Sequence, residues 1–319
     1  MAGFLVRRVL FGLLVLWIIS VVVFVMFFIA PHDVARLLAG RQANQAEIEA
    51  IRRSLGLNRP ILDQYLSWVW KLLHGDLGYS YRASVPVRYL LATRIPVTAS
   101  LAFGAAIIWL VIGVGAGVLA AIRPRTIADR VVTFFALFFY SMPTFLLGLL
   151  LLFFAFFKLY TAGIHLFPGG GYVNLTQDPI GWADHLILPW FTLALVTAAV
   201  YSRLTRGTML DVLGEDYIRT ARSKGISEGR VIFRHALRSA LTPVVTQFGI
   251  DLGTLLGGAI VTENVFGLPG LGQLAVQSIL NQNLPVVIGI VILASFFIVV
   301  ANIGVDFMYA LLDPRVRLS

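Results

Sequence analysis

Six long runs of apolar residues divide this chain, and they constrain its fold more than any other feature of the sequence. Each run has, or comes close to, the roughly 20 residues that a helix needs to cross the hydrocarbon core of a bilayer. The runs cover residues 9–30, 95–122, 131–157, 186–202, 241–261 and 285–305. They are continuously apolar rather than alternating, which favours helices over barrel strands. The sequence therefore predicts an all-α integral membrane protein with about six transmembrane helices.

The composition indicates a lipid environment and argues against several soluble classes. Hydrophobic residues make up 58% of the chain and charged residues only 13%, whereas a soluble domain carries about 25% charged residues. The formal net charge is +9. The basic residues lie between the apolar runs instead of forming one basic face, so we expect membrane lipid and no nucleic acid as a partner. Cysteine is absent, which excludes disulfides and thiolate metal sites.

The positions of the basic residues indicate the orientation. The loops 163–184 and 263–284 contain no lysine or arginine, whereas the loops at the other ends of the spans are basic. The positive-inside rule therefore places both termini in the cytoplasm, in a multi-pass protein of the cytoplasmic (inner) membrane. Arg7 and Arg8 precede a first apolar run that exceeds the roughly 7–15 residues of a signal-peptide core, so we expect a retained span.

The outer segment 31–94 has the pattern of a small helical element. Ile48, Ile51 and Leu55 fall on one helical face. A second apolar stripe follows at a spacing of three to four residues, consisting of Leu62, Tyr65, Leu66, Val69, Leu72 and Leu73. The turn 75–78 (GDLG) ends it. We interpret the segment as a lid packed on the membrane face in preference to a catalytic domain.

Small residues recur inside two of the spans at helical spacing. They are Gly113 and Gly117 in the second span, and Gly249, Gly253 and Gly257 in the fifth. Such residues let helix backbones approach closely in lipid. These glycines lack the strand–loop–helix setting of a nucleotide site, so we interpret them as packing positions. Pro143 predicts a kink in the third span.

Asp251 is the one carboxylate in the middle of a predicted span. An ionisable side chain is costly at this depth and indicates either a cavity or a partner. Two interpretations stay open, namely a contact with the substrate pathway or gate and a structural pairing.

The cytoplasmic loop 207–242 is too long for a simple connector. The pattern predicts a helix over 215–224, with Gly225 as its C-cap glycine, and a second helix that Ser227 can cap. Pro243 marks the turn into the fifth span. The result is a basic, amphipathic, helical knob under the membrane, for which a solvated surface helix or a positive-inside anchor is the alternative. We call residues 215–239 the cytoplasmic knob.

Several separated stretches resemble one transporter family. Residues 216–225 (DYIRTARSKG) and 234–243 (RHALRSALTP) resemble the "EAA" loop of binding-protein-dependent ABC importer permeases, specifically the dipeptide/oligopeptide/nickel branch. The stretches 56–60 (GLNRP), 74–78 (HGDLG), 265–272 (VFGLPGLG) and 312–315 (LDPR) are similar to the same branch. The chain departs from the pattern in having Arg219 at the motif glutamate, Thr220 at its first alanine, and PHDV at 31–34 instead of Pro-Gly-Asp-Pro.

The resemblance implies a type I ABC importer permease fold and divides the chain accordingly. Residues 1–30 would form the cytoplasmic N-terminus and first span, 31–94 the extracytoplasmic element, 95–312 the permease domain with the coupling loop 207–242, and 313–319 a cytoplasmic tail. The EAA loop of this family docks on a separate ATPase and moves the spans like a lever. The positions implied in coupling are Asp216, Arg219, Thr220, Ala221, Arg222, Lys224, Gly225 and Ser227. Ala221 would be a small residue of the docking face.

The resemblance also implies partners and a class of solute. A second homologous permease, ATP-hydrolysing subunits and an extracytoplasmic solute-binding protein would complete the importer. ATP and Mg would be held by partner subunits, so we expect no cofactor, metal or catalytic residue in this chain. Peptides are the implied solute, with nickel chelates, glutathione or another small solute as alternatives. Asp251, Glu263 and Asn264 are candidate residues of the substrate pathway.

Two other classes of function compete with this interpretation. An ion-coupled secondary transporter would normally show internal repeats, broken helices or several buried ionisable groups, and we find one mid-membrane acid and no clear repeat. A membrane enzyme would need a site, but the histidines are scattered without metal-ligand spacing. Neither a G-x-S-x-G elbow nor a P-loop is present. The importer is therefore the favoured interpretation.

Overall fold

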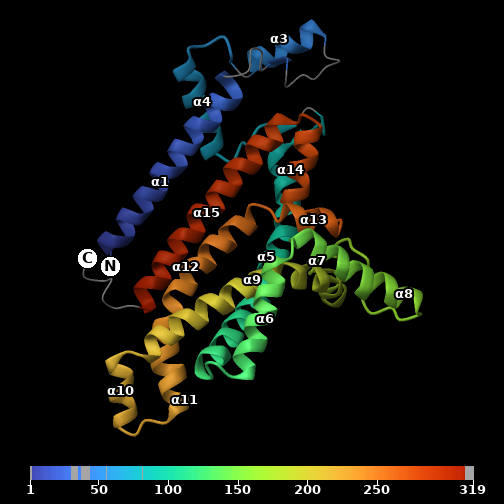
Figure 1. Cartoon of the computed structure of the whole chain (residues 1–319). Helices are drawn as coiled ribbons and strands as arrows, with labels where there is room; N and C mark the ends of the chain where they lie inside the picture. The colour runs from blue at the N-terminus through green and yellow to red at the C-terminus, as the bar shows by residue number, and fades with distance from the viewer. Residues whose placement is uncertain (1, 30–34, 37–43, 55, 81, 313–319) are drawn as a thin grey trace.

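The computed structural model describes the backbone of residues 2–29, 35–36, 44–54, 56–80 and 82–312. Most of this chain is helical, as the apolar runs predict (Figure 1). The predicted positions at Leu55, at 31–34 and at 313–315 lie outside the described residues. Figure 1 shows α3 and α4 at one end of the molecule and α10 and α11 at the opposite end.

The first span and the outer element come first along the chain. Helix α1 (Ala2–Phe24) continues through the π-helical segment η1 (Val25–Ile29). Helices α3 (Gln45–Ser54) and α4 (Ile61–Leu73) follow, and the strands β1 (Tyr79–Ser80) and β2 (Val85–Pro86) pair as a small antiparallel hairpin. The apolar surface of α1 is largely exposed within the chain, which fits a helix whose solvent is lipid.

The centre of the molecule is a pair of long helices. Helix α5 (Val87–Ile122) runs along α9 (Pro179–Leu213). A Cβ at Gly113 would lie 2.9 Å from the carbonyl oxygen of Ala198, and one at Gly117 would lie 2.7 Å from that of Ser202. The two backbones therefore touch where the small residues are, which is the close approach that their spacing predicts.

A second pair packs in the same way. Helix α12 (Leu237–Leu256) lies against α15 (Leu284–Leu312). Gly249 faces Val305 on α15, and a Cβ at Gly253 would lie 3.1 Å from the Cβ of Ala301. Gly257 continues the contact to Ala294. The predicted stripe of glycines in the fifth span is thus the surface on which the last span packs.

The third predicted span is broken and not merely kinked. Helix α6 (Ile127–Ser141) ends before Met142, and α7 (Thr144–Leu151), η2 (Leu152–Lys158) and α8 (Leu159–Thr161) lead away from it (Figure 1). Met142 and Pro143 both have extended backbone, with ψ of 124° and 135°. The prediction of a kink was therefore too weak, because the residue before a proline is driven out of the helical region as well.

The fifth predicted span also ends earlier than its apolar run. Helix α12 stops at Leu256, and Gly258 adopts a φ of +131°, where a Cβ would lie 2.8 Å from the Gly272 nitrogen. The chain then forms α13 (Ile260–Val265) and α14 (Leu271–Leu280). The predicted outer loop 263–284 is therefore largely helical, a correction that follows from the tight turn at Gly258.

Five helices in the described chain are long and apolar enough to cross a membrane. They are Val6–Ile29, Val87–Ile122, Thr144–Thr161, Pro179–Leu213 and Leu284–Met308. Helix α12, the remaining predicted span, has 20 residues but includes Arg238 and Asp251. Its sequence is thus less apolar than that of the other spans, although its length suffices for a crossing.

The outer element is only partly packed. Ile48 and Ile51 of α3 are buried together, as their shared face predicts. On α4, in contrast, Leu62, Leu66 and Leu73 are 67%, 55% and 75% exposed. Within the described chain only the edge of α4 nearest α1 finds a partner, and the packing of the whole stripe on the membrane face stays a prediction.

A candidate coupling site on the cytoplasmic knob

The first helix of the cytoplasmic knob forms where the sequence predicts it. Helix α10 (Asp216–Ser223) begins after Glu215, whose backbone is extended. Gly225 has a φ of +72°, and the Ile226 nitrogen donates to the Ala221 carbonyl oxygen at 3.3 Å. This is the left-handed turn that commonly ends a helix, and glycine adopts it without steric cost.

The second predicted helix is not separate from the membrane span. Helix α11 (Glu228–Arg230) and the π-helical segment η3 (Val231–Ala236) run without interruption into α12. Ser227 stands at the N-cap, but its side chain makes no capping hydrogen bond. Pro243 lies inside α12 and not at a turn. Both details correct the prediction, and the consequence is that the knob is a direct extension of the fifth span.

The inner face of the knob packs on the chain itself. Ile218 is fully buried and Ala221 is 8% exposed. They lie in one cluster with Val118 of α5, Met209 of α9 and Val231 of η3. The Ala221 methyl group thus faces this chain and leaves little surface for a partner, and its place on a docking face stays a prediction.

The opposite face of the knob is open and mostly basic. Arg219, Thr220 and Lys224 are exposed, and Phe233 is 64% exposed. The Arg219 guanidinium lies 3.2 Å from the Asp216 carboxylate, in an exposed pair of the kind that contributes little to stability. An apolar ring within a basic surface is suited to docking on another protein.

An ion pair closes the turn between the two helices of the knob. The Arg222 guanidinium donates to both Glu228 carboxylate oxygens, at 2.7 and 3.1 Å. These hydrogen bonds lower the pKa of the Glu228 carboxyl. Arg222 therefore has a partner within the knob, in addition to being one of the predicted coupling residues.

A further ion pair above the knob was not predicted. Asp129, at the start of α6, accepts from Nε and Nη2 of Arg206 on α9, at 2.7 and 2.9 Å. The backbone nitrogen of Arg125 also donates to this carboxylate at 2.9 Å. Together the Arg206 side chain and the Arg125 backbone hold the pKa of Asp129 at about 2, below its usual 3.8. The only available sequence signal was an isolated acid in an otherwise basic inner loop.

Asp251 has structural partners. The Tyr201 hydroxyl donates to one carboxylate oxygen at 2.9 Å, and the Gln247 amide donates to the other at 3.0 Å. Tyr201 is fully buried beside Trp109. Of the two open interpretations, these contacts favour structural pairing between α9 and α12.

Glu263 and Asn264 do not form a pathway lining together. Glu263 is fully buried and accepts from the Thr98 hydroxyl and the Gln273 nitrogen, each at 2.8 Å. The Thr98 hydroxyl oxygen in turn accepts from the Leu271 nitrogen at 2.8 Å. Asn264 is exposed and donates to the Ile260 carbonyl oxygen. The Glu263 carboxylate thus fastens α13 and α14 to α5, and its role in the substrate pathway stays a prediction.

The predicted residues therefore separate into different regions. The exposed coupling positions gather on one face of the knob, the glycines lie between helices, and Asp251 and Glu263 act as ties between elements. Within the described chain, no group of three or more His, Asp or Glu side chains is placed to hold a metal ion.

Comparison with known proteins identifies the family. Residues 113–318 match the binding-protein-dependent transport system inner membrane component, and residues 1–102 match its N-terminal companion. A Brucella abortus protein named as a peptide transport system permease is 41% identical over 99% of both chains. The glutathione transport system permease protein GsiC of Escherichia coli O6:H1 is 38% identical, again over 99% of both chains.

A solved structure has the same fold. The inward-facing MetNI methionine ABC transporter matches with a TM-score of 0.56 and 22% identity, over 70% of this chain and 97% of that chain. The matched profiles and relatives span nearly the whole sequence, and the helices superpose on a type I importer. The chain thus belongs to the binding-protein-dependent transport system inner membrane components, as a multi-pass ABC importer permease of the inner membrane.

Proposed function

We propose that this chain forms half of the translocation pathway of an ATP-driven peptide importer and that its cytoplasmic knob receives the ATPase. The observation that carries the proposal is the construction of the knob. Its inner face shares a buried cluster with α5 and α9, while its outer face is exposed and basic. A partner that moves the outer face would move the spans with it, because tightly packed helices move together as a rigid unit.

The relatives support a peptide as the solute. One is named for peptide transport and another for glutathione transport, and glutathione is itself a tripeptide. Nickel chelates and other small solutes remain alternatives within the family branch. The candidate pathway residue Asn264 is exposed on α13, which suits a contact with a solute, whereas Asp251 and Glu263 are engaged within the chain.

The proposed assembly contains four kinds of partner. A second permease completes the pathway, ATP-hydrolysing subunits bind the knob and supply ATP and Mg, a solute-binding protein docks on the outer side, and lipid surrounds the spans. This chain would be a non-catalytic subunit. Both termini would lie in the cytoplasm, with the knob on the same side and α3 and α4 outside, since these elements occupy opposite ends of the molecule (Figure 1).

Co-purification tests the coupling role. We would tag the chain, extract it in mild detergent, and compare the wild type with Arg219→Glu and Phe233→Glu, which change exposed positions of the knob. Arg59→Glu, at an exposed outer position, is the matched control. We expect the wild type and the control to bring down an ATPase and a second permease, and the knob variants to lose at least 90% of the ATPase while keeping the permease.

Two outcomes would contradict the proposal. If the knob variants retain the ATPase as the wild type does, the exposed face of the knob is not the docking surface. If the purified wild-type chain transports solute alone, down an ion gradient and without ATP, the chain functions as a secondary transporter. If the expected result is obtained instead, mass spectrometry of the ligand of a captured binding protein would identify the solute class.

A further inference from the structure

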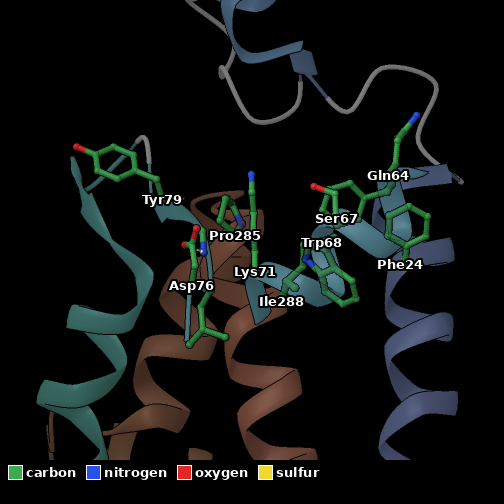
Figure 2. Close-up of a pocket in the computed structure, with 12 residues that line it drawn as sticks. Phe24, Gln64, Ser67, Trp68, Lys71, Asp76, Tyr79, Pro285 and Ile288 are labelled. Carbon is green, nitrogen blue, oxygen red and sulfur yellow. Dashed lines mark hydrogen bonds between the residues drawn. The ribbon is translucent and has the colours of Figure 1, made fainter. Parts of the chain in front are cut away.

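A cavity of about 110 Å³ lies at the outer end of the molecule, away from the knob. Its walls come from three parts of the chain that are distant in sequence, namely α1 with η1, α4 with the turn that follows it, and the start of α15. Figure 2 shows α4 running across the ends of α1 and α15, with Trp68 and Phe24 on one side of the cavity and Asp76 on the other. None of the coupling or pathway residues lines this cavity.

One wall of the cavity is a rigid aromatic cluster. The ring centroids of Phe24 and Phe28 are 5.1 Å apart, and Trp68 lies 5.9 Å from each. Tyr65 packs edge-on against Phe24, and its hydroxyl lies 2.8 Å from that of Ser20. These contacts fix α4 on α1 and so hold the wall in place. The cavity is therefore a formed feature and not a loose gap between helices.

The rim of the cavity carries polar groups with unused hydrogen-bonding capacity. The Lys71 ammonium has no hydrogen bond or ion pair within the described chain, nor has the Ser67 hydroxyl. Asp76 accepts one bond through Oδ1, from the Gly78 nitrogen at 3.0 Å, which leaves its Oδ2 available. The rim thus offers one cation, one hydroxyl and one carboxylate oxygen above an apolar aromatic floor (Figure 2).

The surroundings place this cavity at the boundary between membrane and water. Below it, the side chains of Val22 on α1 and Val25 on η1 are exposed on the apolar surface of a helix that is long and apolar enough to cross a membrane. Beside it, α4 presents an exposed apolar stripe that includes Leu62 and Leu66. An amphipathic helix of this kind lies in the interface, with aromatic rings at the level of the headgroups. Any ligand of the cavity should therefore be amphipathic.

We propose that the cavity binds the headgroup of a phospholipid that carries a phosphate and a primary ammonium group. Lys71 and Ser67 donate to the phosphate oxygens, since an ammonium on a flexible stem is a common phosphate ligand. Asp76 accepts from the lipid ammonium through Oδ2. The glycerol and the first acyl carbons lie on Phe24 and Trp68, and the chains continue along the apolar surface of α1. The bound lipid joins α4 to the first span.

The chemistry of the rim predicts which headgroup is preferred. A quaternary ammonium, as in phosphatidylcholine, has no N–H to donate to Asp76. Phosphatidylglycerol has the phosphate but no cation. Soluble phosphoethanolamine and short peptides share the zwitterionic character but lack acyl chains to occupy the aromatic floor. The cavity should thus bind phosphatidylethanolamine more tightly than phosphatidylcholine or phosphatidylglycerol. Phosphoethanolamine and short peptides should displace the bound phosphatidylethanolamine only poorly.

Native mass spectrometry of the purified, delipidated complex tests the proposal. We would add phosphatidylethanolamine, phosphatidylcholine or phosphatidylglycerol and count the retained lipids. The wild type should retain one phosphatidylethanolamine at least tenfold better than either other lipid. Lys71→Gln and Trp68→Ala should each reduce this retention at least tenfold. Asp76→Asn should remove the preference over phosphatidylcholine. Lys158→Gln, at another exposed lysine, is the matched control and should behave as the wild type.

Three results would overturn the proposal. They are equal retention of the three lipids by the wild type, retention by Lys71→Gln equal to that of the wild type, and displacement of the lipid by equimolar phosphoethanolamine or dialanine. The last result would mean that the cavity is a site for a soluble zwitterion. Lys71 is exposed and pairs with none of the residues that the structure describes, so its replacement should not unfold the chain. The lipid result is independent of whether the chain carries peptides.

Discussion

The ion pair between Asp129 and Arg206 gives the sharpest prediction about stability. Replacing Arg206 with Met removes two short charge-assisted hydrogen bonds and leaves a carboxylate that is 8% exposed without its cation. Hydrogen bonds to charged groups contribute about 1.5–3 kcal/mol, and stranding a buried charge costs about 3–5 kcal/mol. Because the Arg206 side chain is 33% exposed, water replaces part of the loss. We therefore expect Arg206→Met to destabilise the chain by about 2–3 kcal/mol.

Thermal unfolding of the purified permease in detergent measures this effect. A domain of 150–250 residues shifts its midpoint by roughly 2–4 °C per kcal/mol, and a longer chain shifts at the low end of this range. The apparent midpoint should therefore fall by about 4–6 °C. Arg203→Met is the matched control, since Arg203 is exposed on the same helix and its guanidinium lies over the Tyr140 ring, 5.5 Å from the ring centroid. Loss of this cation–π contact should lower the free energy of unfolding by about 0.5–1 kcal/mol.

A double-mutant cycle decides whether the ion pair itself is responsible. Asp129→Asn combined with Arg206→Met should be less destabilising than the sum of the two single changes, by at least about 1 kcal/mol. The depressed pKa of Asp129 means that the pair is intact above the unfolded value near 3.8 and is lost only as the pH falls towards 2. The effect of Arg206→Met should thus be constant from about pH 5 to 8. Additive single effects, or a marked pH dependence in this window, would refute the reasoning.

Three other changes probe the remaining features. Gly253→Val should destabilise the α12–α15 contact by about 1–3 kcal/mol through overpacking, whereas Gly115→Val, with open space around it, should be well tolerated; a thermal midpoint for each checks this. Gly225→Ala should cost about 1–2 kcal/mol at its positive φ and weaken ATPase co-purification. Thr98→Val should cost about 1–3 kcal/mol, because it removes the hydroxyl that donates to the buried Glu263, and it should increase proteolysis between α13 and α14.

The sequence predicts the spans and their packing faces well, for a physical reason. Lipid tolerates only structures that satisfy their own backbone hydrogen bonds, so long apolar runs must be helices. Helix contact in lipid also depends on small residues, which made Gly117 and Gly253 recognisable from spacing alone. The turn at Gly225 was predictable for the same kind of reason, because it depends on local backbone chemistry.

Contacts between residues that are far apart in the sequence could not be predicted from the spacing of residues along the chain. Asp129 and Arg206 are 77 positions apart, and Thr98 and Glu263 are 165 positions apart. Nothing local distinguishes Glu263 from a carboxylate in an outer loop, which explains its assignment to the pathway. The breaks in the third and fifth spans were underestimated, because hydropathy measures how apolar a run is and not whether its backbone is continuous.

The position of the breaks bears on how movement could reach the spans. On one side the knob continues straight into the membrane, since η3 passes directly into α12. On the other side Ala221 of α10 lies in one buried cluster with residues of α5, α9 and η3. The Asp129–Arg206 ion pair also fixes the start of α6 to α9. The tight turn at Gly258 lies at the far end of α12. Displacement of the knob should therefore move the inner halves of the central helices together, and the bending should occur at the outer end of α12.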